Sequence, residues 1–292
     1  MPELPETETI ARDLDAALRG AAIAGVDVPR PSVLRGVTPA ELDRRTRGAR
    51  VVRVWRRAKL IVLDLSTGDR LAVQPRFTGT LLLEGFGEPF PEAERRFVRA
   101  TFRLADGRAA GDRYLHYRDI RTLGTVALLA PAAFDAYVAR LGPEPLDPAF
   151  TAAALGRVLG RSAQPVKRVL MDQARLAGVG NIYANEALWS ARVHPARPAR
   201  SLTGAEVRAL RDAVVDALDE SVRHGGTTFE NFLSPRGRRG EYVRHLKAYG
   251  RAGRPCFRCG DALEETRDVD GRSTVFCARC QPADGAAEDR AA

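Results

Sequence analysis

The first eight residues of the chain, MPELPETE, supply residue types suited to covalent chemistry on a sugar aldehyde. Removal of Met1 would leave Pro2 as an N-terminal secondary amine, followed by Glu3, Glu6 and Glu8. An α-amino group has a pKa of about 7.7–8.0, so it is partly unprotonated at neutral pH and can act as a nucleophile. A secondary amine forms a positively charged iminium ion with an aldehyde. That charge withdraws electrons from the neighbouring carbons, and elimination is the expected next step.

The same segment also has a purely structural interpretation. Proline is tolerated at a chain start because its missing N–H costs nothing there, and glutamates favour the positive end of a helix. Ile10, Leu14 and Leu18 recur at helical spacing until Gly20, which predicts such a helix. Short motifs often match by chance, so these residues alone leave both interpretations open.

Four cysteines near the C-terminus predict a metal site. Their spacing is Cys256-x2-Cys259-x17-Cys277-x2-Cys280. Two CxxC pairs at this separation can direct four thiolates toward one tetrahedral Zn²⁺, which gives one structural zinc ion per chain. Disulfides are the alternative, and a reducing compartment disfavours them. The segment between the pairs predicts two short strands joined by a turn at Asp270-Gly271, with Arg272 at the tip.

Composition favours an acidic partner. The 292 residues carry a formal net charge of +9, and residues 223–258 hold nine arginines or lysines against two acids. Nucleic acid is the commonest partner of such a surface. No apolar run reaches the length of a membrane span, and no signal-peptide pattern precedes the first helix. We therefore expect a cytoplasmic protein without a membrane partner, associated with the nucleoid if the cell is bacterial.

The pattern of apolar residues predicts an α+β protein with several domains. Residues 1–130 read as a leading helix followed by short strands of an antiparallel sandwich or barrel. Residues 131–149 contain four prolines and are interpreted as a linker. Helical patterns fill residues 150–240, a zinc finger residues 241–282, and a disordered tail residues 283–292.

Two helix starts are visible within the helical part. Thr203 and Glu206 form a capping box ahead of an apolar repeat that Gly225-Gly226 ends. Asn181, after a glycine-rich turn, is placed to cap another helix. The exposed N–H groups of such a helix start suit a phosphate, although Asn181 could serve as a cap and nothing else.

MPELPETE, the block LMDQARLAGVGNIYANEALWSARVHP and the cysteine pairs occur in the order found in one family, to about Gln281. The chain resembles the formamidopyrimidine-DNA glycosylases, bifunctional base-excision enzymes that use the N-terminal proline as nucleophile. The resemblance implies a β-rich catalytic domain with a leading helix, a helix-two-turn-helix domain and a zinc-finger hairpin, with damaged double-stranded DNA lying in the cleft between them. It also implies a monomer.

The resemblance assigns roles to residues of this chain. Pro2 would attack the sugar anomeric carbon, Glu3 would transfer protons, and Glu6 would orient the helix start and the amine. Lys59 coincides with a lysine near the catalytic pocket. It shares strand phase with Ile61 and Leu63, and only three lysines occur among 46 basic residues.

Further roles concern DNA contacts. Arg272 would grip phosphates next to the lesion, although a solvated arginine is the alternative. Asn181 would contact the damaged strand, and Lys167 would line the DNA channel. Lys247 is interpreted as a surface lysine.

Base excision requires the damaged nucleotide to leave the helix, at a cost of about a few kcal/mol, and a wedge to fill the gap. The matching wedge positions are Phe77, Arg121 and Leu123, and Gln74 occupies a phosphate-contacting position. The family usually has methionine at the first position, phenylalanine at the third and histidine in place of Gln74. We therefore expect a working wedge whose discrimination of the opposite base is altered.

Glu230, in GGTTFENFL, stands where some members carry lysine in a loop that helps enclose the extruded base. It would favour formamidopyrimidines over 8-oxoguanine, unless it points to solvent and pairs with Arg236. Two other functions remain open. One is a non-catalytic zinc-ribbon DNA-binding protein. The other is an endonuclease VIII-like glycosylase for oxidised pyrimidines, which Leu4 and GGTTFENFL disfavour.

Overall fold

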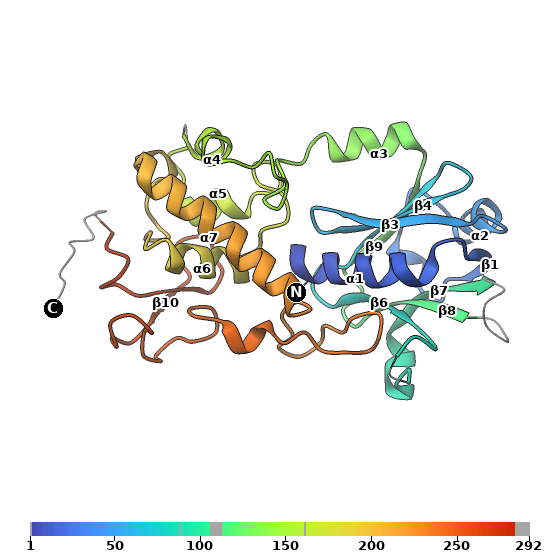
Figure 1. Cartoon of the computed structure of the whole chain (residues 1–292). Coiled ribbons are helices and arrows are strands. Elements are labelled where there is room, and N and C mark those ends of the chain that lie inside the picture. Colours follow the sequence, from blue (N-terminus) through green and yellow to red (C-terminus); the bar gives the residue numbers. More distant parts are fainter. Residues whose placement is uncertain (1, 88, 106–112, 161, 284–292) are drawn as a thin grey trace. The chain divides into compact units, whose positions relative to one another are not determined.

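The computed structural model describes residues 2–87, 89–105, 113–160 and 162–283. The chain forms two compact units, which Figure 1 shows coloured along the sequence. One unit contains Met1–Arg140 and Ser221–Val243, and the other contains Leu141–Glu220 and Arg244–Ala292. Met1 and most of the expected tail, residues 284–292, lie outside the described residues.

The first unit begins with the predicted helix, α1 (Leu4–Leu18). Leu4, Ile10, Leu14 and Leu18 are buried at helical spacing. Gly20 follows with φ +87°, a left-handed conformation that ends the helix without a side-chain clash. The apolar face of α1 thereby packs into the main core, which contains residues of both sheets of this unit.

Two sheets form the body of the unit. The strands are β1 (Ala22–Asp27), β2 (Leu34–Arg35), β3 (Val51–Arg57), β4 (Leu60–Leu65), β5 (Arg70–Gln74), β6 (Gly79–Leu83), β7 (Val98–Ala105), β8 (Arg113–Asp119) and β9 (Thr125–Leu129). One sheet has the order β1-β7-β8-β6 and the other β2-β9-β5-β4-β3. The pairs are antiparallel except β2 with β9, which is parallel. This arrangement confirms the predicted β-sandwich with a leading helix.

Short helices accompany the sheets. They are α2 (Pro39–Thr46), two 3₁₀ helices η1 (Pro31–Val33) and η2 (Glu92–Phe97), and α3 (Pro131–Val138). The helix α3 lies in the segment interpreted as a linker. Its Phe134 is buried in a cluster with Leu60 and Val62 of β4 and meets the ring of Trp55 edge-on at 5.6 Å. The prolines of this segment favoured its interpretation as a linker. Phe134 nevertheless packs against the five-stranded sheet.

The segment Ser221–Val243 belongs to the first unit, although the expected helical domain extended to residue 240. The backbone N–H of Leu83 on β6 donates to the carbonyl of Pro235 at 3.1 Å, and Thr80 Oγ1 donates to the carbonyl of Leu233 at 2.7 Å. Strand β6 is the edge of its sheet. The returning segment therefore satisfies polar groups that this edge would otherwise expose.

The second unit holds the remaining elements. They are α4 (Ala152–Leu159), α5 (Val166–Met171), α6 (Asn181–Ser190), η3 (Ala199–Ser201), most of α7 (Gly204–Arg223), part of η4 (Tyr242–His245), β10 (Glu264–Thr266) and β11 (Thr274–Phe276). The capping box of α7 is present: Thr203 Oγ1 accepts from the Glu206 N–H, and Glu206 Oε2 accepts from the Thr203 N–H. Among the described residues, we find no helix long and apolar enough to cross a membrane.

Candidate active site and nucleic-acid interface

Pro2 and Glu3 directly precede α1, and both are buried. One turn into the helix, the Glu6 carboxylate accepts two backbone hydrogen bonds of 2.7 Å. Oε2 accepts from the Glu3 N–H, and Oε1 accepts from the Thr227 N–H. The Glu6 carboxylate therefore holds the backbone of the residue that follows Pro2 and also binds the returning segment.

Lys59 lies in the β3–β4 turn, so its predicted strand position is wrong. Arg57 pairs with Leu60, which leaves Ala58 and Lys59 as a two-residue turn, with Ala58 at φ +53°. Alternation of apolar residues continues across a tight turn of this kind, which is why the strand prediction ran through it. The side chain of Lys59 is half-buried.

Contacts from α1 hold this turn near the N-terminus. Thr7 Oγ1 lies 3.5 Å from the Ala58 carbonyl oxygen, and Thr7 also donates to the Glu3 carbonyl at 2.9 Å. Arg56 Nε donates to the Glu8 carboxylate at 2.8 Å. Burial raises the pKa of Glu8, but the guanidinium groups of Arg56 and Arg12 together outweigh it and lower that pKa. The structure thus brings Pro2, Glu3 and the Lys59 turn to one end of α1.

The three predicted wedge residues gather at the surface of the first unit. Phe77 and Leu123 are 44% and 41% exposed, unusually high for large apolar side chains in this chain. The Arg121 guanidinium lies 4.9 Å from the centroid of the Phe77 ring. Gln74 ends β5 opposite Thr125 of β9 and is half-buried. Exposed apolar side chains beside an arginine suit insertion between bases.

Asp119, a buried carboxylate that the sequence did not single out, binds the two loops that carry the predicted wedge residues Phe77, Arg121 and Leu123. Asp119 is fully buried. Its Oδ1 accepts from Thr78 Oγ1 at 2.5 Å and the Arg121 N–H at 3.2 Å; its Oδ2 accepts from the Gly124 N–H at 2.8 Å and the Tyr117 hydroxyl at 3.2 Å. Burial and the neighbouring carboxylate raise the pKa of Tyr117, which keeps it a donor. The sequence feature that could have indicated this role is the motif DIRTLG, in which an aspartate precedes a glycine that can form a turn.

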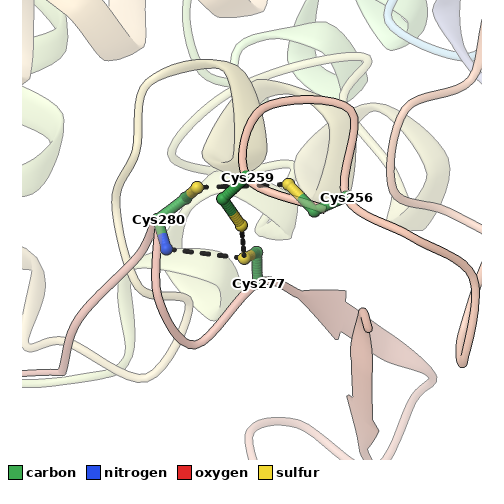
Figure 2. Close-up of side chains that lie close together, drawn as sticks. All are labelled: Cys256, Cys259, Cys277 and Cys280. Atoms are coloured by element: carbon green, nitrogen blue, oxygen red, sulfur yellow. Dashed lines mark hydrogen bonds between the residues drawn. The ribbon is translucent and has the colours of Figure 1, made fainter. Parts of the chain in front are cut away.

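The four cysteines converge as predicted (Figure 2). Cys256 and Cys280 have Sγ atoms 4.0 Å apart, Cys259 and Cys277 have Sγ atoms 3.5 Å apart, and all four lie within 4.8 Å of one another. A tetrahedron with Zn–S bonds of about 2.3 Å has edges of about 3.8 Å. The thiols therefore lie close enough together to hold one zinc ion, and disulfide bonds, at about 2.05 Å, are not formed.

The finger hairpin connects β10 and β11 through residues 267–273. Arg272 is exposed on this connection, and its N–H donates to Asp270 Oδ1 at 3.1 Å. The strands are three residues each, and Asp270-Gly271 lies in the connection between them, as the sequence pattern indicated. The arginine is thus displayed on a hairpin held by the zinc site and by its own aspartate turn.

The expected position of Lys167 in a DNA channel is corrected by the structure. Its side chain is fully buried, and Nζ donates to Thr274 Oγ1 at 2.7 Å and to Asp270 Oδ1 and the Ser273 carbonyl at 3.2 Å. Asn181 is the first residue of α6 and Gly180 is its N-cap. The Asn181 amide donates to the same Ser273 carbonyl at 3.0 Å. Both side chains therefore support the Arg272 hairpin.

Glu230 is exposed on the returning segment. Arg236, its expected alternative partner, instead pairs with Asp13 at 3.1 Å and lies 4.2 Å over the Phe86 ring. Glu230 therefore faces solvent, as the alternative expected, but the ion pair that Arg236 forms is with Asp13 on α1.

This combination of a leading helix on a β-sandwich, a helical unit and a four-cysteine finger defines a class of DNA glycosylases. Family models match in order the formamidopyrimidine-DNA glycosylase N-terminal domain over residues 1–126, its H2TH domain over residues 141–232, and a zinc finger found in FPG and IleRS over residues 253–283. The chain belongs to the formamidopyrimidine-DNA glycosylase family, as its motifs predicted.

Individual relatives match along nearly the whole chain. The formamidopyrimidine-DNA glycosylase of Thermomicrobium roseum is 40% identical over 97% of this chain and 99% of its own length, and that of Pelotomaculum thermopropionicum is 38% identical over 96% and 99%. Among solved structures, Lactococcus lactis Fpg bound to DNA containing N7-benzyl-Fapy-dG is 28% identical with a TM-score of 0.85, covering 96% of this chain and 100% of that one. The MutM (Fpg) protein of Thermus thermophilus is 37% identical with a TM-score of 0.82, covering 96% and 98%.

Proposed function

We propose that this chain removes oxidised purines from double-stranded DNA and cuts the strand at the resulting abasic site through an iminium ion on Pro2. The observation that carries the proposal is the fixed helix start, where Glu6 binds the Glu3 N–H and the returning segment at once. A nucleophile must be held within a fraction of an ångström of its reacting geometry to be effective. The N-terminus of α1 is held in this way.

The steps follow from the residues at that end of α1. Once Met1 has been removed, the Pro2 nitrogen attacks the anomeric carbon while Glu3 transfers protons to and from the sugar, and the base leaves. The iminium ion on Pro2 then makes the adjacent carbon acidic, and elimination breaks the bond to the 3′ phosphate. Lys59 contributes a positive charge beside the site. Zinc stays structural, since four thiolates leave it no open position.

The exposed side chains supply DNA contacts in this proposal. Phe77, Arg121 and Leu123 fill the space left by the extruded nucleotide, and Arg272 binds a phosphate. Asn181 and Lys167 act through the hairpin that they hold. We expect the enzyme to work as a monomer on nucleoid DNA.

Borohydride trapping tests the nucleophile. Reduction of an iminium ion should join the protein covalently to abasic-site DNA, and both Pro2→Gly and a form that retains Met1 should trap at a small fraction of the normal rate. Lys247→Met, which alters an exposed lysine of the other unit, is the control and should trap normally. Undiminished trapping by both N-terminal variants would exclude Pro2 and direct attention to Lys59.

A panel of duplexes, each with one lesion, separates the substrate classes. Faster release of formamidopyrimidines and 8-oxoguanine than of oxidised pyrimidines supports the purine proposal, and the reverse order supports an endonuclease VIII-like activity. A protein that binds these duplexes but never cuts abasic sites would be a non-catalytic zinc-ribbon binder.

A further inference from the structure

One face of α6 contacts the zinc finger along its whole length. Asn181, Asn185 and Trp189 follow one another at intervals of four, which places them on the same side of the helix. Asn181 donates to the Ser273 carbonyl at 3.0 Å, and the Asn185 amide oxygen accepts from the Val275 N–H at 2.6 Å. The first two residues thus bind the backbone of the hairpin. The third, Trp189, lies at the end where the cysteines converge.

Trp189 is enclosed by the zinc site. Its side chain is 6% exposed and packs in one cluster with Cys256, Cys277 and Val275. The Arg258 guanidinium lies 4.0 Å over the indole ring and donates to the Trp189 carbonyl. Arg258 thereby covers one face of the ring. Within the described residues, the buried indole Nε1–H makes no hydrogen bond. Buried N–H groups without a partner are rare in folded proteins, so this one calls for an acceptor.

The cysteines provide such an acceptor when zinc is bound. A zinc ion with four thiolates carries a net charge of −2, and hydrogen-bond donors around the sulfurs disperse it. The Cys280 N–H already points to Cys277 Sγ at 3.4 Å. Cys256 packs in the same cluster as Trp189, and Arg258, two residues after it, lies 4.0 Å over the indole ring, which places the Cys256 turn against the indole.

We propose that the Trp189 indole Nε1–H donates a hydrogen bond to the Cys256 thiolate of the zinc-loaded finger. Trp189 is then a positioning residue, which fixes a metal ligand from the helix that also binds the hairpin. The inference rests on zinc occupying the four cysteines and does not depend on the glycosylase chemistry. The hydrogen bond disperses part of the −2 charge of the zinc–thiolate centre and fixes the orientation of the Cys256 side chain, so zinc is held more tightly.

Zinc release measures this bond directly. Trp189→Phe keeps an aromatic ring in the cluster and removes only the N–H donor. Loss of a partner around a metal ligand typically lowers metal affinity about 10- to 100-fold, and we expect at least a tenfold faster transfer of zinc to a chromogenic chelator. Trp55→Phe is the matched control, since its indole donates to Asp64 at 3.0 Å, in the first unit. It should release zinc at the normal rate.

The indole proton gives a second, spectroscopic measurement. The chain has two tryptophans, so Trp55→Phe leaves Trp189 as the single indole N–H resonance. Cadmium loading of that variant should produce a scalar coupling between the metal and the Trp189 Nε1 proton, transmitted through the hydrogen bond. Zinc loading should move the resonance downfield and slow its exchange with water.

Three results would overturn the proposal. One is equal zinc release by Trp189→Phe and the unaltered chain. Another is absence of coupling and of any zinc-dependent change in the indole resonance. The third is an equal loss of thermal stability in the zinc-loaded and zinc-free forms of Trp189→Phe, which would mean that the ring only fills the core.

Discussion

The carboxylate of Glu6 accepts a 2.7 Å hydrogen bond from the backbone N–H of Thr227, although 221 positions separate the two residues. Gly226, next to Thr227, has φ +87°, and a Cβ added there would lie 3.0 Å from Glu6 Cγ. A glycine is therefore required both by its backbone conformation and by the close approach of the glutamate. The start of α1 and the returning segment fit together only with these residue types.

The first prediction concerns this contact. Glu6→Gln replaces one of two accepting oxygens by an NH₂ group that must face a backbone N–H, and leaving a buried donor unpaired costs about 1–3 kcal/mol. If part of that cost appears in the barrier to amine attack, borohydride trapping should slow about tenfold. Glu41→Gln, on α2, where the half-exposed carboxylate lies 3.4 Å from Arg45, is the control. An unchanged trapping rate in Glu6→Gln would show that this carboxylate does not orient the amine.

The second prediction concerns the wedge. Asp119→Asn replaces a carboxylate that accepts four hydrogen bonds, and we expect a loss of about 1–3 kcal/mol in unfolding free energy because at least one donor is left unpaired. Base release from duplex DNA should fall more than trapping on single-stranded abasic DNA, which needs no wedge. Asp216→Asn, exposed on α7, should change neither rate. A proportional loss in both assays would argue against a wedge-specific role.

The third prediction separates two residues of the zinc-finger hairpin. Lys167→Met leaves Asp270 buried without its cation, and breaking a buried pair costs about 3–5 kcal/mol. Stability and DNA affinity should therefore fall together. Arg272→Ala should leave stability unchanged, weaken binding on all sequences alike, and reduce the salt-dependence slope by about one. If Lys167→Met binds DNA normally, the hairpin does not depend on this lysine.

The fourth prediction concerns lesion choice. Glu230 is exposed, and Arg236 pairs with Asp13, so the Glu230 carboxylate can accept hydrogen bonds from the N–H groups of a formamidopyrimidine. We expect faster single-turnover excision of formamidopyrimidines than of 8-oxoguanine, and a smaller preference in Glu230→Lys. Equal rates that stay equal in the variant would mean that Glu230 does not sense the base.

The fifth prediction concerns acid stability. The pKa of Glu8 is lowered in the folded chain because Arg56 and Arg12 together overcome the effect of burial. A lowered carboxyl pKa stabilises the fold above the unfolded-state value of about 4.3 and loses that contribution as the pH falls through the folded-state pKa. The unaltered chain should therefore exceed Glu8→Gln in unfolding free energy near neutral pH, with the difference shrinking in acid. Glu92→Gln, whose side chain is 86% exposed, should show no such trend.

Local patterns in the sequence determined the helix α1, the capping box of α7, the strands of the sandwich and the zinc ligands. Each depends on residues close together in the chain: apolar spacing, a cap three residues from its partner, or two cysteines in one turn. The family motifs then led to the proposal for Pro2 and Glu3, because a terminal amine needs no distant residue to be recognised.

Tertiary structure decided which of the remaining polar side chains face solvent and which are buried in internal hydrogen bonds and ion pairs. Lys167 and Arg272 are both basic residues of matching motifs, yet one is buried under the hairpin and the other exposed on it. Asp119, Trp189 and the Glu6–Thr227 contact likewise depend on segments that meet only after folding. Sequence spacing carries no information about such pairs, because burial and hydrogen-bond partners are set by the three-dimensional approach of distant backbone.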